Sequence, residues 1–454
     1  ARGGESITGI NAAGHRHSRT SCYSGTKMAE DDPWGVSKPY SYLVLQVPQL
    51  LVDYNGSPEA RKYLVELADG LLAHARREGG RYTLPMAIRY ADDRELEATR
   101  GFFPWHVFWG PWKWTGDRKY LAPLLEAEPN PTTMNPNVLD LLGLRETVGA
   151  RLLAQGRSGG AVGRSGRNGG FGAGNGHLLW QLTGDKSNLE RLYASQIEEC
   201  DLLDYINTEG SLWIDRVSVP YADLQRARLG GIALVRNSLY PGHTISWKFA
   251  APANDQSVAI LVPDATTTHF KVIAYNLETA PVRATLTGWN IDPGIWEITQ
   301  GIDTNDDDTA DGALATRSAA FERTRSIDLT LPPRAATVLT FTLKTPGTPY
   351  WQRPDLGLDP QDVTVRGREV RVTVHSLGSV PAPATTIALR DSAGRTLATA
   401  AVPALDAPND LRPKTTGITL TLPAGASAAG ASVEIDPDHV LTEITTRNNA
   451  VSLP

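Results

Sequence analysis

Hydrophobic residues recur along the chain with two different periods. Between residues 36 and 240 they fall three and four positions apart, as in the segment 63–75, and this spacing predicts amphipathic helices. After residue 243, short runs rich in Val, Ile and Thr are separated by Pro, Gly, Asn and Asp, which predicts strands of antiparallel sheets. About seven such runs follow residue 354, a number typical of an immunoglobulin-like sandwich.

These periods divide the chain into three expected domains. We predict a helical domain over residues 1–242, an antiparallel β-sandwich over 243–347 and an Ig-like β-sandwich over 354–454. The expected fold class is therefore multidomain α + β. The Gly-rich segment 156–176 follows no β-rich run, so a mobile surface loop is favoured there over a dinucleotide site.

The helical part contains a repeated break. Segments 53–64, 113–121 and 181–189 each join an aromatic or apolar stretch to a Gly, then to an Asp or Ser that can cap a new helix. The repeat predicts helical hairpins. A closed ring of six hairpins needs more residues than 36–240 supply, so the ring is expected to be short and open, or completed by a part absent from this sequence.

Charge and composition exclude several classes of protein. The 454 residues carry 44 Lys plus Arg and 50 Asp plus Glu, and a net charge of −6 offers no basic field for nucleic acid. No apolar run is long enough to span a membrane. Two cysteines, Cys22 and Cys200, are too few for a disulfide framework or a four-thiolate metal site. They could form one disulfide, which the sequence does not decide. The sequence begins at Ala1 without a signal-peptide pattern, which suggests a processed chain or a fragment.

Two regions resemble known families. Segments 354–356, 375–378, 433–443 and 448–450 resemble the CARDB domain, which implies an accessory role and a secreted or cell-surface protein attached through this module. The Trp-rich front of the chain, its hairpin repeat and the strand–turn–strand 289–297 resemble the (α/α)-toroid polysaccharide lyases and related glycoside hydrolases. That resemblance implies a carbohydrate-active enzyme with a polysaccharide substrate.

The candidate catalytic residues lie near the N-terminus, at Asn11, His15, His17, Arg19 and Tyr23. A lyase must neutralise a uronate carboxylate, remove a proton and protonate the leaving oxygen. Asn or Arg suits the first task, and His or Tyr suits the proton transfers. A basic flexible terminus is the simpler alternative. A metal site on His15 and His17 is a further one, although the sequence identifies no third ligand.

The candidate substrate-binding residues are aromatic and basic. Trp105 and Trp109 would share one face of a helix and could cover the apolar face of a sugar, with His106 between them; packing in a core is the alternative. Arg89 and Tyr90 are candidates for binding a uronate carboxylate. Surface ion pairing is the alternative for the arginine.

One acidic loop resembles a calcium-binding loop. Asp303, Asn305, Asp307 and Asp311 place oxygen-bearing side chains at alternating positions, which suits a structural Ca²⁺ ion. The loop lacks the Gly and the final acidic residue of such motifs, so an acidic turn between strands is the alternative. No cofactor is expected to be required for the chemistry.

The sequence thus favours a secreted polysaccharide lyase acting by β-elimination. The alternative enzyme is a glycoside hydrolase that uses acidic residues near Glu209 and Asp215. A third interpretation is a non-catalytic extracellular protein that binds glycan or mediates adhesion.

Overall fold

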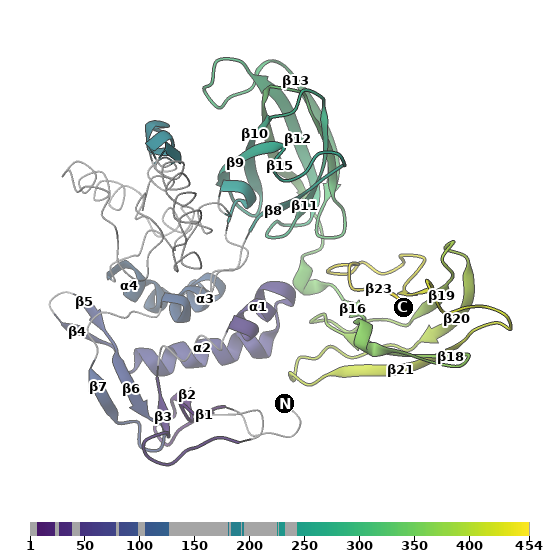
Figure 1. Ribbon diagram of the computed structural model, residues 1–454. Coiled ribbons are helices and arrows are strands. Elements are labelled where there is room, and N and C mark those ends of the chain that lie inside the picture. Colours follow the sequence, from purple (N-terminus) through teal and green to yellow (C-terminus); the bar gives the residue numbers. More distant parts are fainter. Residues whose placement is uncertain are drawn as a thin grey trace, which may run out of the picture.

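The fold is known from a computed structural model (Figure 1). It describes residues 7–22, 27–38, 46–78, 81–98, 105–126, 180, 183–191, 193–194, 225, 227–231 and 243–453. Of the described residues, 41% lie in strands and 18% in helices. The prediction of a helical-hairpin (α/α) toroid over residues 1–242 is therefore wrong.

The error lies in residues 76–98, which run as strands between the helices. Polar and apolar residues alternate at 81–84 and at 95–98, and alternation of this kind favours strands. The strands of the N-terminal unit, residues 7–126, form three small sheets. These are β1 (Thr8–Ile10) with β2 (Arg16–Ser18), β3 (Val36–Ser37) with β6 (Pro85–Arg89) and β7 (Glu95–Ala98), and β4 (Arg76–Glu78) with β5 (Arg81–Thr83).

The predicted helix breaks are present. Helices α1 (Gln46–Asn55) and α2 (Pro58–Leu72) are separated by Gly56, whose φ of 72° favours glycine, and the Ser57 hydroxyl caps α2 by accepting from the amide of Ala60. Helices α3 (Trp105–Thr115) and α4 (Arg118–Glu126) meet at Gly116 in the same conformation. No helix within the described ranges is both long and apolar enough to cross a membrane.

Helix α2 provides much of the core of the N-terminal unit. Leu67 and Leu71 on one face of the helix are fully buried and belong to a cluster with Ile88 of β6, Phe108 of α3 and Tyr120 of α4. Burial of a leucine side chain contributes about 1.5–3 kcal/mol, so this cluster holds the helices and the β3–β6–β7 sheet together.

Residues 245–346 form two antiparallel sheets around one core. Trp296, Phe270, Phe321 and Phe341 fill that core, and their rings lie 4.3–6.3 Å apart. The five-stranded sheet has the order β13–β12–β15–β10–β9 and the three-stranded sheet the order β14–β11–β8. The strands are β8 (Ile245–Phe249), β9 (Val258–Ala265), β10 (His269–Asn276), β11 (Val282–Gly288), β12 (Gly294–Asp303), β13 (Asp311–Phe321), β14 (Ile327–Leu331) and β15 (Ala336–Pro346).

The C-terminal unit, residues 354–453, also has two sheets around one core, formed by Val372 of β18, Ile387 of β19 and their neighbours. One sheet has the order β16–β18–β17 with β21 paired to β18, and the other the order β20–β19–β22–β23. The strands are β16 (Leu356–Gly357), β17 (Val363–Arg366), β18 (Glu369–Ser376), β19 (Thr385–Arg390), β20 (Thr396–Val402), β21 (Lys414–Thr421), β22 (Ser432–Ile435) and β23 (Ala450–Ser452); the 3₁₀ turns η3 (Tyr350–Gln352) and η4 (Pro360–Asp362) precede β16 and β17.

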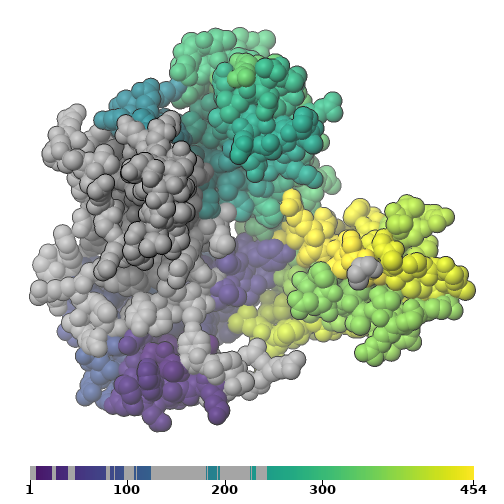
Figure 2. All heavy atoms as spheres, viewed as in Figure 1, coloured from purple at the N-terminus to yellow at the C-terminus, as the bar shows by residue number. Residues whose placement is uncertain are grey.

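The three units meet at the C-terminal end of α1. Arg323, from the loop after β13, donates to the carbonyl oxygens of Asp53 and Tyr54 and lies over the rings of Tyr54 and Tyr350. The Tyr54 hydroxyl donates to Asp355 of the C-terminal unit. Figure 2 shows α1 bordering the C-terminal unit at this junction.

Candidate functional site

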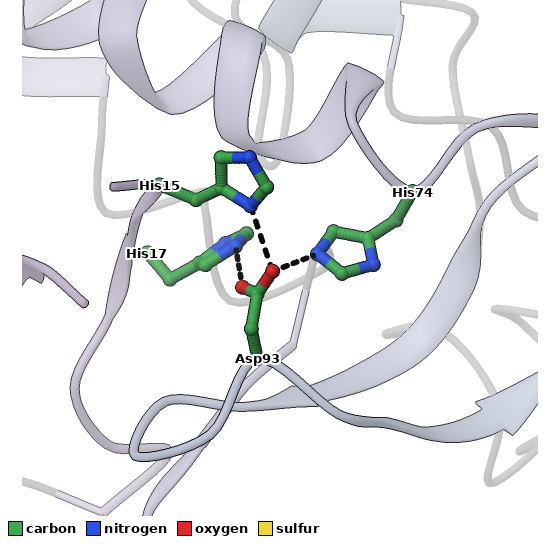
Figure 3. Close-up of side chains that lie close together, drawn as sticks. All are labelled: His15, His17, His74 and Asp93. Carbon is green, nitrogen blue, oxygen red and sulfur yellow. Dashed lines mark hydrogen bonds and ion pairs between the residues drawn. The ribbon is translucent and has the colours of Figure 1, made fainter. Parts of the chain in front are cut away.

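Three histidines and one aspartate converge in the N-terminal unit (Figure 3). His15 precedes β2 and His17 lies on it, His74 follows the end of α2, and Asp93 lies in the turn between β6 and β7. The three imidazole rings point at the Asp93 carboxylate, and their centroids lie 5.5–6.1 Å apart. Three separate segments of the chain therefore build one compact polar centre.

Asp93 is in contact with each imidazole. His15 Nδ1 lies 2.7 Å from Asp93 Oδ2, His17 Nε2 lies 3.1 Å from Oδ1, and His74 Nε2 lies 3.2 Å from Oδ2. Only the contacts of His15 and His17 have hydrogen-bond geometry. His74 Nε2 is buried and has no hydrogen-bond partner among the described residues. Asp93 itself has a φ of 60°, a left-handed backbone conformation that is uncommon for a residue other than glycine.

The four side chains differ in exposure. The side chain of His17 is 0% exposed, that of His74 9%, that of Asp93 14% and that of His15 33%. Burial lowers the pKa of His17 to about 4, although the charge of Asp93 opposes this, so His17 is neutral at pH 7. Burial alone would raise the pKa of Asp93, but hydrogen bonds from Asn11 and His15 reverse the effect and the pKa is lowered.

Asn11 fixes the turn that carries His15. Its side-chain oxygen accepts from the amides of Ala13 and His15, and its side-chain amide donates to Asp93 Oδ1 at 2.5 Å. Gly14, with a φ of 85°, completes the turn. Asn11 is therefore a bridge between the hairpin and the cluster.

Polar contacts attach the β1–β2 hairpin to helix α2. Arg16 donates to Glu66 at 2.6 Å and lies 5.1 Å from the centre of the Tyr63 ring. Gly70 allows the closest approach, since a Cβ atom there would lie 2.5 Å from the carbonyl oxygen of Arg16. The buried hydrophobic cluster around α2 includes no residue of the hairpin.

His74 is held from its other side by a carboxylate. Its Nδ1 lies 3.2 Å from Glu95 Oε1, and Glu95 also pairs with Arg76. If Nδ1 carries the proton and donates it to Glu95, Nε2 presents a lone pair to the cluster. The Glu95 contact holds the orientation of the ring.

The structure brings together three of the five predicted catalytic residues, Asn11, His15 and His17. Arg19 pairs with Glu30 at 2.6 Å, and Tyr23 lies outside the described residues. Sequence reasoning missed His74 and Asp93.

The predicted substrate-binding residues are not gathered at the cluster. Arg89 forms two hydrogen bonds to Asp92, and the Tyr90 hydroxyl donates to the carbonyl oxygen of Ile10 at 3.1 Å. Trp105, His106 and Trp109 lie on helix α3, as expected, but their side chains lie outside the described residues.

The acidic residues predicted for a hydrolase, Glu209 and Asp215, also lie outside the described residues, as does Cys200. Cys22 is exposed and free.

The acidic loop differs in detail from the predicted calcium site. The carboxylate of Asp303 accepts from the amides of residues 305–308, and Asp311 accepts from Thr304. Asp306 and Asp308, both with positive φ, are the residues that approach Asp303, and Lys186 lies 3.1 Å from each of them. The positive φ values break the alternation on which Asn305 and Asp307 were chosen. Calcium binding remains a prediction, to be tested by melting with Ca²⁺ and with EDTA.

No known protein family matches the chain, and no curated protein matches it. Similar solved structures include a β-porphyranase of glycoside hydrolase family 86 from Bacteroides plebeius, at 7% identity, 37% coverage of this chain and 34% of that one, and a TM-score of 0.12. A β-glucuronidase from Ruminococcus gnavus has 10% identity, 41% and 36% coverage and a TM-score of 0.15. The chain spans about a third of the length of these carbohydrate-active enzymes. TM-scores this low carry no argument about fold or function.

Proposed function

We propose that this chain is a carbohydrate-active enzyme that cleaves a glycan by hydrolysis, with His15 transferring a proton at the His15–His17–His74–Asp93 cluster. The observation that carries the proposal is the 2.7 Å contact of His15 Nδ1 with Asp93, at the one imidazole of the cluster that reaches solvent. His17 and His74 are buried, so neither can meet a substrate directly.

Asp93 supports proton transfer by His15. A carboxylate that accepts from Nδ1–H orients the ring and leaves Nε2 to take a proton from water or return it to a leaving oxygen. The part of the chain that the structure describes places no hydrogen-bond partner on His15 Nε2. The same carboxylate stabilises the imidazolium that forms during the reaction.

A glycan substrate is supported by exposed aromatic surface close to the hairpin. Trp34 is 48% exposed, and its neighbour Gly35 accepts from the amide of Tyr90, whose hydroxyl reaches Ile10 of β1. An indole ring covers the apolar face of a sugar and adds one N–H donor. The resemblance of the C-terminal module to the CARDB domain supports a secreted or cell-surface location.

We favour hydrolysis over β-elimination because the two residues predicted to neutralise a uronate, Asn11 and Arg19, already contact carboxylates of the protein. The Asn11 amide is engaged by Asp93 and the Arg19 guanidinium by Glu30. A carboxylate partner already in place disfavours binding of a substrate carboxylate by either side chain, and elimination without such a partner lacks stabilisation of the enolate-like charge.

Assays on neutral and acidic polysaccharides test the proposal. We expect new reducing ends without absorbance at 235 nm, because only elimination creates an unsaturated uronate. His15→Ala should lower the rate by about 10²–10⁴-fold, the usual contribution of an acid–base group. His269→Ala, at a partly exposed histidine of the β8–β15 unit, should retain the rate. Absorbance at 235 nm would replace hydrolysis by elimination, and full activity of His15→Ala would refute the role of this residue.

A further inference from the structure

The geometry points to a divalent transition-metal site, best suited to Zn²⁺, formed by His17, His74, Asp93 and His15. The inference deepens the proposed function, since it names an ion at the same cluster, but it stands on the arrangement of the ligands and has its own readout.

The ligand set is chemically suited to zinc. Three imidazoles and one carboxylate make a nitrogen-rich set, which suits zinc and its transition-metal neighbours, whereas Ca²⁺ and Mg²⁺ take oxygen ligands. The four ligand atoms all lie within 4.8 Å of one another. All come from residues that the fold holds in place: a short strand, the end of a helix and a tight turn.

The spacing is close to that of a tetrahedral site. Ligands about 2.0–2.1 Å from a zinc ion lie about 3.3 Å from each other in a tetrahedron. The three nitrogens lie 2.7–3.2 Å from the Asp93 oxygens. The remaining pairs of ligand atoms lie within 4.8 Å of one another, so the imidazole nitrogens would move closer together around a bound ion.

The environment of His74 favours a cation at the cluster. Its buried Nε2 has no hydrogen-bond partner and lies 3.2 Å from Asp93 Oδ2, while Nδ1 faces Glu95. If Nδ1–H donates to Glu95, the Nε2 lone pair faces the anionic Oδ2 of Asp93, which is unfavourable. A metal ion at Nε2 removes this conflict, because the lone pair then binds the ion and Nδ1–H donates to Glu95.

Glu95 provides the outer support that metal-binding histidines usually have. A carboxylate behind a ligating imidazole fixes its orientation and raises its basicity. Arg76 pairs with Glu95 and orients it in turn. Glu95 is thus a positioning residue for His74.

His15 is the ligand that can exchange. It is the most exposed of the four, and zinc sites that perform chemistry keep one position for water. If an ion were held by His17, His74 and Asp93 alone, its fourth position would be open to water, and His15 would be free to act as the proton-transfer group proposed above. The three more buried ligands, His17, His74 and Asp93, would retain the ion.

Zinc titration of the metal-depleted full-length protein tests the inference. We expect one Zn²⁺ per chain by calorimetry, and Co²⁺ in its place should give the intense visible absorption of a tetrahedral site. His17→Ala and His74→Ala should lose this binding. Glu95→Gln, which keeps all four ligands, should bind about 10–100-fold more weakly.

His375→Ala is the matched control. His375 forms a 2.8 Å pair with Asp362, similar to the His15–Asp93 pair, but the described residues place no second imidazole there. Its loss should leave zinc binding unchanged. Circular dichroism checks that each variant is folded, and the folded Glu95→Gln variant provides the test if a ligand variant does not fold.

The outcomes separate the two proposals. Absence of zinc binding in the wild-type protein, or equal binding in His17→Ala, His74→Ala and His375→Ala, would overturn the metal site. Zinc binding without turnover of any glycan would overturn the proposed function and leave the metal site standing. Glycan hydrolysis by a protein that binds no zinc would do the reverse.

Discussion

The stability of the junction at Asp355 should decrease as the pH rises. Asp355 is fully buried in the C-terminal unit, next to the Tyr54 hydroxyl of α1. Burial raises its pKa from 3.8 to about 7; the hydrogen bond from Tyr54 opposes the shift, and the charge of Glu443 adds to it. The folded protein therefore keeps this proton at a pH where the unfolded chain has lost it.

The sign and size follow from proton linkage. The contribution of Asp355 is fully present below pH 3.8, the unfolded pKa, and is lost as the pH rises through the folded pKa of about 7. A separation of about three pKa units corresponds to about 4 kcal/mol, of which about 2.5 kcal/mol is lost between pH 5 and pH 8. His17 and His243 have the opposite effect on stability. Burial lowers their pKa to about 4, so their contribution to the free energy of unfolding grows as the pH rises from 4 to 6.5.

Hydrogen exchange measures this contribution locally. The opening free energy of amides in β18, which pairs with β16 beside Asp355, is determined at several pH values in the wild-type protein and in Asp355→Asn. Asparagine does not titrate, so the wild-type advantage over the variant should shrink by about 2.5 kcal/mol from pH 5 to pH 8. Both histidines are present in both proteins and cancel. A difference that stays constant over this range would refute the reasoning.

Two further substitutions test the N-terminal unit. Gly70→Ala gains about 1 kcal/mol of helix propensity, but its Cβ would meet the Arg16 carbonyl at 2.5 Å; we expect a net loss of about 1–2 kcal/mol and weaker zinc binding, whereas Gly417→Ala, with open space around it, should change neither. A stabilised Gly70→Ala variant with unchanged zinc affinity would contradict the close packing. Leu67→Ala should lower the urea-unfolding free energy by about 2–5 kcal/mol, while Leu314→Ala, at a half-exposed position, should stay within about 0.5 kcal/mol; equal losses would contradict the assigned core.

Local signals in the sequence predicted parts of the fold well. The break at Gly56 and Ser57 depends on a glycine conformation and a hydroxyl cap, both set by adjacent residues. The alternating runs after residue 243 correspond to strands because one face of each is buried. The toroid prediction was wrong because it extended helical spacing across residues 76–98. Strands form there by pairing with residues distant in the sequence, such as Val36.

Only part of the candidate site could be predicted from the sequence, again because local signals reveal only residues that are close in the chain. His15 and His17 stood out because they are neighbours in sequence. Asp93 lies 78 residues from His15, and His74 follows an ordinary amphipathic helix, so neither carries a local signal. Only the docking of the hairpin on α2 and on the β6–β7 turn makes them one site.

The junction at Arg323 has a mechanical consequence. Its guanidinium holds the end of α1 against Tyr350, and Tyr54 and Asn55 bind Asp355 and the carbonyl of Leu377 directly. A pull on the C-terminal unit would therefore be transmitted to α1 through these side chains as well as along the chain. The N-terminal unit would then keep a fixed orientation relative to the C-terminal unit when force is applied.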